Sequence, residues 1–297
     1  MTMGINFKEA LAMLSQALPA VLFRAGIFVA GGFMVIILFG MLLFVFRLAG
    51  SASPVLVIVV TVLAVLGWWI SGRVLQRFFL YRQRVAMLLF FSGCSLPAPG
   101  LAATIHEAGR YFNNYSQWQA LNRWLRRVLL SFYCSSGQVF ETLALPRQTG
   151  IGKYIDMLAV GPLSQAVLAL AFSRGGTDAG RSAREGLALY FRHGTESRRQ
   201  ARQWLWFSAA GLTFLFLCLA IPNWLFFRSA GAPVEIGIVL AVTIAWLLHQ
   251  AFVIPFVLAG VSGTLLAETR GKIPDPDLCE KLGSLVPNTA VPGKRTD

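Results

Sequence analysis

The sequence AGIFVAGGFMVIILFGMLLFVF occupies residues 25–46 and carries no charged side chain between Arg24 and Arg47. An α-helix needs about 20 apolar residues to cross the hydrocarbon core of a bilayer. A buried helix of a soluble protein is usually shorter and carries a polar face. At 22 residues, this stretch therefore predicts a transmembrane helix.

Three further uncharged intervals are long enough to cross a membrane, and they occupy residues 48–72, 203–227 and 236–267. With the first interval they predict an all-α, polytopic helical membrane protein with about four transmembrane helices. Short connections join the intervals in pairs. The predicted arrangement is therefore two transmembrane hairpins, at 25–72 and 203–267.

The composition agrees with this class of protein. Of the 297 residues, 56% are hydrophobic and 13% are charged, whereas a soluble domain carries about 25% charged residues. This apolar character excludes intrinsic disorder. The formal net charge is +13, but the scarcity of charged residues argues against a soluble nucleic-acid binder, and no nucleic-acid partner is predicted.

The basic residues are concentrated between the two hairpins, in residues 73–202. Cytoplasmic loops of membrane proteins carry an excess of Lys and Arg. The distribution therefore predicts a bacterial inner-membrane protein with residues 73–202 and both termini in the cytoplasm. The C-terminal tail, 268–297, is predicted to be cytoplasmic as well.

The first 24 residues are predicted to form an amphipathic helix on the cytoplasmic side, because apolar residues recur there every three or four positions from Phe7 to Leu22. A signal peptide is the alternative. Two shorter apolar intervals lie in the central region. Residues 85–105 are predicted to be helical only at 85–91, because Gly93 and Pro97 break the pattern. Residues 157–173 are predicted to form an interfacial or buried helix, with a fifth span as the alternative.

The central region also contains a basic amphipathic segment, residues 116–132. Arginines suit lipid phosphates and tryptophans suit the headgroup boundary. The alternative is a helix that packs on its own protein and turns its basic side to solvent. Anionic lipid headgroups are the predicted partners, and the predicted lipid-contact residues are Arg73, Arg77, Arg82, Arg84, Trp118, Arg123, Trp124, Arg126 and Arg127. A helix after this segment is predicted to begin at Ser182 as its N-cap and to end at Gly194.

One ionisable residue, His249, lies inside a predicted span and is followed by Gln250 and Pro255. Ionisable groups at membrane depth are costly and usually face a bundle interior or a hydrated cavity. Pro255 has no backbone N–H, so we expect a carbonyl near Ala251 to lack its helical donor. These residues form the predicted pathway. The alternative is a neutral histidine that holds neighbouring helices together.

The side-chain inventory offers no catalytic, cofactor-binding or metal-binding motif. The three histidines lack HExxH spacing, the four cysteines lack a CxxC pair, and no GxSxG sequence occurs. The predicted protein is therefore not an enzyme and binds no cofactor.

The second half of the chain resembles a family of uncharacterised polytopic membrane proteins from bacteria and archaea. The resemblance rests on Val160-Gly161-Pro162-Leu163, on residues 183–190 (AREGLALY) and on residues 268–277 (ETRGKIPDPD). It implies an inner-membrane architecture without a known activity. In the order of its elements the chain is more remotely similar to choline-transporter-like proteins, which would imply passage of a quaternary amine.

The functional hypothesis from sequence is a transporter-like or permease-like membrane protein of unknown substrate. The alternative is a non-catalytic scaffold, or a subunit that binds lipid or a partner through its basic central region. Membrane-protein partners or further copies of the same chain are compatible with both hypotheses.

Overall fold

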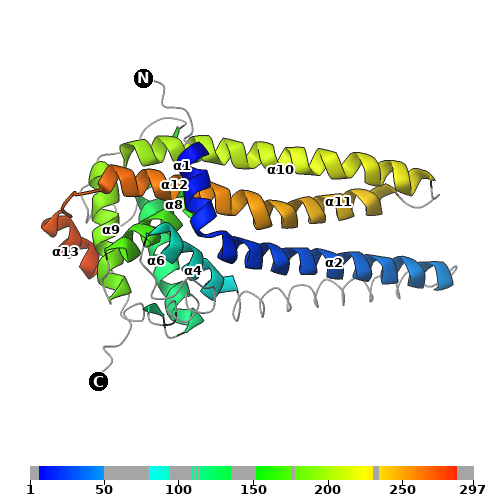
Figure 1. Ribbon diagram of the computed structural model, residues 1–297, viewed down its shortest axis with the longest axis horizontal. Coiled ribbons are helices and arrows are strands. Elements are labelled where there is room, and N and C mark those ends of the chain that lie inside the picture. The colour runs from blue at the N-terminus through cyan, green and yellow to red at the C-terminus, as the bar shows by residue number, and fades with distance from the viewer. Residues whose placement is uncertain are drawn as a thin grey trace. The chain divides into compact units, whose positions relative to one another are not determined.

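A computed structural model describes residues 7–49, 80–93, 109, 111–112, 114–134, 152–174, 178–229 and 234–285. These residues form helices and contain no strand (Figure 1), which confirms the all-α fold class for the described part of the chain. The chain divides into two units. Unit 1 contains residues 1–21, 81–208 and 255–297, and unit 2 contains residues 22–80 and 209–254.

Unit 2 is built from long apolar helices. They are most of α2 (Leu18–Ala49), the C-terminal part of α10 (Thr195–Ser229), and α11 (Val234–Leu248) with the π-helical turn η2 (His249–Val253). Ala25 and Phe28 of α2 pack with Leu247 and Ala251 in a buried cluster. Large apolar side chains on the outer faces are exposed, including Phe33 at 63% and Phe214 at 66%. Apolar surface of this extent is typical of helices that contact lipid.

Among the described residues, two helices are long and apolar enough to cross a membrane, Thr195–Ser229 and Gly237–Thr269. A third candidate is the pair Phe7–Gln16 and Leu18–Met34, if these helices, bent by 83°, count as one span. These segments contain the third and fourth predicted spans and part of the first. The predicted span at 48–72 lies outside the described residues. The structure therefore supports a helical membrane protein with two or three candidate spans.

Unit 1 is centred on α8 (Gly152–Ser173), which contacts α4 (Tyr81–Phe91), α6 (Tyr115–Cys134) and α9 (Ala179–His193). Leu163, Val167 and Leu168 of α8 are fully buried. The predicted apolar segment 157–173 is therefore a core helix of this unit. Its neighbours appear as the green and cyan helices of Figure 1.

The basic amphipathic segment forms α6, and its apolar side is covered by protein. Eight of its residues are buried: Trp118, Leu121, Trp124, Leu125, Val128, Leu129, Phe132 and Tyr133. They face α8 and α9, where the Tyr133 hydroxyl is hydrogen-bonded to the hydroxyl of Tyr190. Of the two predicted environments, the structure shows a helix packed on its own protein.

Helix ends in unit 1 follow local chemistry. α4 ends at Phe91 and Gly93 has a φ of 68°, which confirms the predicted break after residue 91. The predicted start of α9 at Ser182 is wrong. Asp178 is the N-cap, and its carboxylate accepts hydrogen bonds from the backbone N–H groups of Gly180 and Arg181 at 2.8 and 3.1 Å. The predicted end of α9 at Gly194 is confirmed.

The N-terminal segment is not one amphipathic helix over residues 1–24. α1 (Phe7–Gln16) ends before Ala17, and α2 begins at Leu18 with Pro19 in its first turn. The Phe7 ring lies against Trp204, with the centroids 5.5 Å apart, and against Phe207 and Phe256. α1 therefore packs on the protein in unit 1.

Residues 268–277 connect four helices in two pairs, α12 with α10 and α13 with α9. Glu268, in α12 (Ile254–Thr269), accepts hydrogen bonds from the backbone N–H groups of Glu196 and Ser197 at the start of α10, at 3.0 and 2.9 Å. Asp275 caps α13 (Pro276–Ser284) and forms an ion pair with Arg192 of α9 at 2.5 Å. A carboxylate at a helix N-terminus satisfies open N–H groups and favours the helix dipole.

We expect Gly260→Ala to destabilise the protein. A Cβ atom at Gly260 would lie 2.2 Å from Cε2 of Trp204, which is fully buried. Overpacking of this kind costs about 1–3 kcal/mol. Thermal unfolding of the detergent-solubilised protein measures the effect. Gly26→Ala is the control, because nothing lies within 4 Å of a Cβ atom there. Equal melting temperatures for the two variants would contradict the expectation.

Candidate functional site

The regular backbone hydrogen bonding of the apolar helix in unit 2 is interrupted at η2. The backbone N–H of Ile254 donates to the carbonyl of His249, five residues earlier, instead of to Gln250. The following residue is Pro255, which has no N–H. The Gln250 carbonyl therefore receives no donor from either position of its own helix that would normally supply one.

Arg24 supplies the missing donor from α2. Its Nε atom donates to the Gln250 carbonyl oxygen at 2.9 Å. The Arg24 side chain is only 1% exposed, and its guanidinium carbon lies 5.1 Å from the centroid of the Phe28 ring. A buried charge is tolerated where hydrogen bonds and aromatic faces replace water. The turn and the arginine thus form one polar cluster inside an apolar unit.

His249, the first residue of the π-helical turn, is 6% exposed and belongs to the same unit. The structure thus places two of the predicted pathway residues, His249 and Gln250, in the irregular turn, next to a cation from another helix. Pro255 is buried at the start of α12 and acts through its missing N–H. The prediction put the open carbonyl near Ala251, whereas Arg24 binds the carbonyl of Gln250.

Sequence reasoning missed Arg24 as a site residue. In the sequence it marks only the charged boundary before the uncharged stretch 25–46. Its position one turn before Phe28 was the available signal, since an arginine and an aromatic residue at i and i+4 lie on the same helix face. The partner carbonyl could not be found without the fold.

The predicted lipid-contact residues are distributed over different environments. Arg82, Arg123, Arg126 and Arg127 are exposed, whereas Trp118 and Trp124 are each 3% exposed and belong to the core. The prediction that these two tryptophans contact lipid is therefore wrong, because protein covers both side chains. Arg73 and Arg77 lie outside the described residues.

Arg84 and Arg126 lie close enough for their charges to interact. Burial lowers the pKa of the Arg84 guanidinium, and the positive charge of Arg126 lowers this pKa further, while Tyr115 opposes the shift. The two helices α4 and α6 therefore present neighbouring positive charges on unit 1.

Metal-binding and redox groups are sparse in the described ranges. No group of three His, Cys, Asp or Glu side chains lies together there as a metal site. Cys134, Cys218 and Cys279 are free thiols. Trp204 is fully buried in a cluster with Phe7, Phe207 and Phe256.

No protein-family model, curated protein or solved structure matches this chain. The resemblances to a family of bacterial and archaeal membrane proteins and to choline-transporter-like proteins therefore stay predictions. The function has to be argued from the chain's own residues.

We expect Arg24→Leu to destabilise the protein by about 1–3 kcal/mol, because the Gln250 carbonyl would be left buried without a donor. Chemical unfolding in a mild detergent measures this difference. Arg228→Leu is the matched control in unit 2, since Arg228 is exposed and lies 5.3 Å from the ring centroid of Trp224. If Arg24→Leu unfolds no more readily than Arg228→Leu, the hydrogen bond to the Gln250 carbonyl does not contribute to the free energy of unfolding.

Proposed function

We propose that the chain is an integral protein of the bacterial inner membrane, of the transporter or permease type, with a polar pathway past Arg24, His249 and Gln250. The observation that carries this proposal is the hydrogen bond from the buried Arg24 guanidinium to the open Gln250 carbonyl. The substrate is unassigned. Four spans, with the termini and the basic central region in the cytoplasm, complete the proposed topology.

The cost of such a site supports a functional role. A charged side chain within a membrane-spanning region is expensive and marks a substrate, ion or proton pathway in many membrane proteins. Helices interrupted near the bilayer midplane use open carbonyls to bind ions in secondary transporters. π-Helical turns are also frequent at functional sites. A helix that served only as an anchor would need neither the π-helical turn nor the buried cation.

The competing role for the same cluster is structural, with Arg24 as a link between α2 and the interrupted helix. The two roles differ in hydration. A pathway needs contact with water at His249 during its cycle, whereas a structural link stays dry. Water contact is therefore the property to measure.

We expect a cysteine at position 249 to react with a small, charged methanethiosulfonate reagent in proteoliposomes. The background replaces Cys94, Cys134, Cys218 and Cys279 with serine. The thiolate is the reactive form and needs water. His249→Cys should therefore react at least about ten times faster than Phe252→Cys. Phe252 is 48% exposed and lies on the outer, apolar side of the same turn.

The outcome is read only on variants that remain folded, as judged by size-exclusion chromatography and thermal unfolding. Gln250→Cys is the second variant if His249→Cys does not fold. Folded thiols at both 249 and 250 that react no faster than Phe252→Cys would contradict a hydrated pathway and leave the structural role.

A second function, binding of anionic lipid or an acidic partner by the central region, is favoured by the exposed basic side of α6. Arg123, Arg126 and Arg127 are exposed there, and Arg126 lies near Arg84. Each basic residue near an anionic membrane contributes about 1 kcal/mol. This function is compatible with a pathway in unit 2.

We expect the triple variant with Arg123, Arg126 and Arg127 changed to glutamine to lose its preference for phosphatidylglycerol over phosphatidylcholine, measured as lipid retained in native mass spectrometry. The loss should exceed about tenfold, because three basic contacts are removed. A variant with Lys8, Arg181 and Arg199 changed to glutamine removes the same charge elsewhere in unit 1. An equal loss in both variants would show a net-charge effect and would count against an α6 site.

A further inference from the structure

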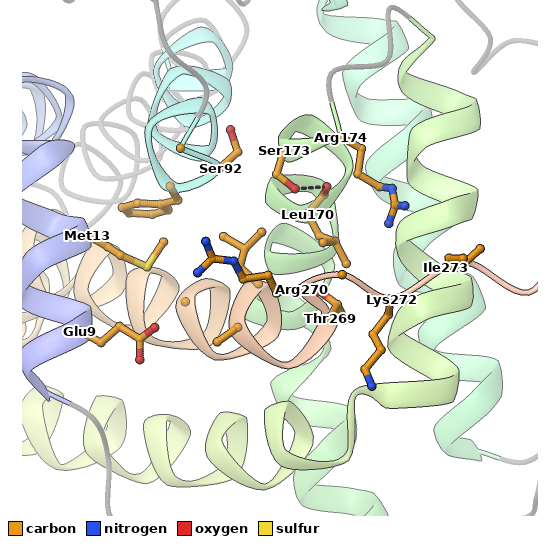
Figure 2. A pocket seen from close by; sticks show the side chains of 16 residues that line it. Glu9, Met13, Ser92, Leu170, Ser173, Arg174, Thr269, Arg270, Lys272 and Ile273 are labelled. Carbon is orange, nitrogen blue, oxygen red and sulfur yellow. Dashed lines mark hydrogen bonds between the residues drawn. The ribbon is translucent and has the colours of Figure 1, made fainter.

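Unit 1 contains a cavity of about 870 Å³ that the proposed pathway does not use. It lies among α1, the C-terminal ends of α4 and α8, and the last turns of α12 with the segment that follows (Figure 2). Cavities of about 300–1,000 Å³ are typical of sites for small organic ligands. The size therefore suits a ligand larger than a simple ion.

One part of the cavity lining is apolar. Met13 of α1, Phe91 of α4, Leu170 of α8 and Leu266 of α12 contribute to it. The approach of α1 to α12 is close, because a Cβ atom at Gly263 would lie 2.6 Å from Sδ of Met13. The glycine thus allows two helices to meet beside the cavity. This surface can accept an alkyl or other apolar group.

The other part of the lining is positively charged. Arg174, Arg270 and Lys272 contribute to it, whereas Glu9 is the acidic side chain among the lining residues that the structure describes. Arg174 is partly neutralised by Glu185 at 3.7 Å. Within the described ranges, neither Arg270 nor Lys272 has a carboxylate within 4 Å. Positive charge at this site therefore exceeds negative charge.

Arg270 and Lys272 follow directly after α12, and Figure 2 shows their side chains pointing in different directions. The backbone N–H of Lys272 donates to the carbonyl of Thr269 at 3.1 Å, and Gly271 between the cations has a φ of 71°. This left-handed conformation suits glycine. Figure 2 shows the Arg270 side chain directed toward the Met13 side of the cavity. Basic residues in the last turn of a helix also favour its dipole, but this effect does not require an apolar cavity next to them.

We propose that this cavity binds a phosphate ester with an apolar group, the phosphate against Arg270 and the apolar group against Met13, Phe91 and Leu266, with Lys272 adding positive charge to the lining. Arginine and lysine are the side chains that most often bind phosphate. The ligand is either a soluble phosphate ester or the headgroup region of an anionic lipid, since both carry this chemistry. The site is separate from Arg24 and His249, and it would stand if the pathway proposal failed.

The test uses the full chain in nanodiscs of phosphatidylcholine and hexyl phosphate as the probe, with binding measured by isothermal titration calorimetry. The double variant Arg270→Ala with Lys272→Ala should weaken binding at least about tenfold, because the charge-assisted contact of Arg270 and the positive charge of Lys272 are both lost. Arg123→Ala removes an exposed arginine outside the cavity and should leave the Kd unchanged. Inorganic phosphate should bind more weakly than hexyl phosphate, because it lacks the apolar group.

Nanodiscs that contain phosphatidylglycerol distinguish the two sources of the phosphate. Weaker hexyl phosphate binding in these nanodiscs, with the double variant insensitive to the lipid, supports a lipid headgroup as the ligand, whereas unchanged binding supports a soluble ester. Absence of binding by folded parent protein, or equal Kd values for the double variant and Arg123→Ala, would overturn the proposal. Equal affinity for inorganic and hexyl phosphate would overturn the role of the apolar lining.

Discussion

The structure depends on a constraint that applies to every helix in an apolar environment, namely that each backbone carbonyl needs a donor. A membrane supplies no water to replace a missing hydrogen bond. Pro255 and the π-helical turn remove the donors of the Gln250 carbonyl, and the Arg24 guanidinium replaces them. The irregular turn therefore provides an acceptor for the buried guanidinium, and the guanidinium provides a donor for the open carbonyl. Neither would be stable in this unit without the other.

Unit 1 is stabilised differently, by a buried core and by capped helix ends. Its helices bury an apolar core around α8, and carboxylates bind the open N–H groups at helix ends. Asp178 and Asp275 cap their own helices, whereas Glu268 caps α10 from another helix. Because capping satisfies N–H groups that a helix leaves open, these carboxylates fix where the elements begin. Arg123, Arg126 and Arg127 of α6 are exposed outside this core.

The sequence was informative where one physical requirement dominates. Length without charge located the apolar helices, and the period of α6 identified its buried face correctly. Its limits are equally physical. A stripe of Trp and Leu looks the same whether it faces lipid or protein, so Trp118 and Trp124 were assigned to the wrong environment. Ser182 and Asp178 are both competent N-caps, and the helix begins after Asp178, whose carboxylate accepts from the N–H groups of Gly180 and Arg181. The partner of Arg24 lies 226 residues away and depends on tertiary structure.

The close approach of Trp204 to Gly260 links two positions that are distant in sequence. The indole occupies the volume that a side chain at 260 would need, so a change at either position alters what the other can be. Residues in such contact have non-additive effects on stability. Among homologous chains, a smaller residue at 204 should therefore accompany a side chain at 260. The pair would thus show in an alignment as a correlated substitution.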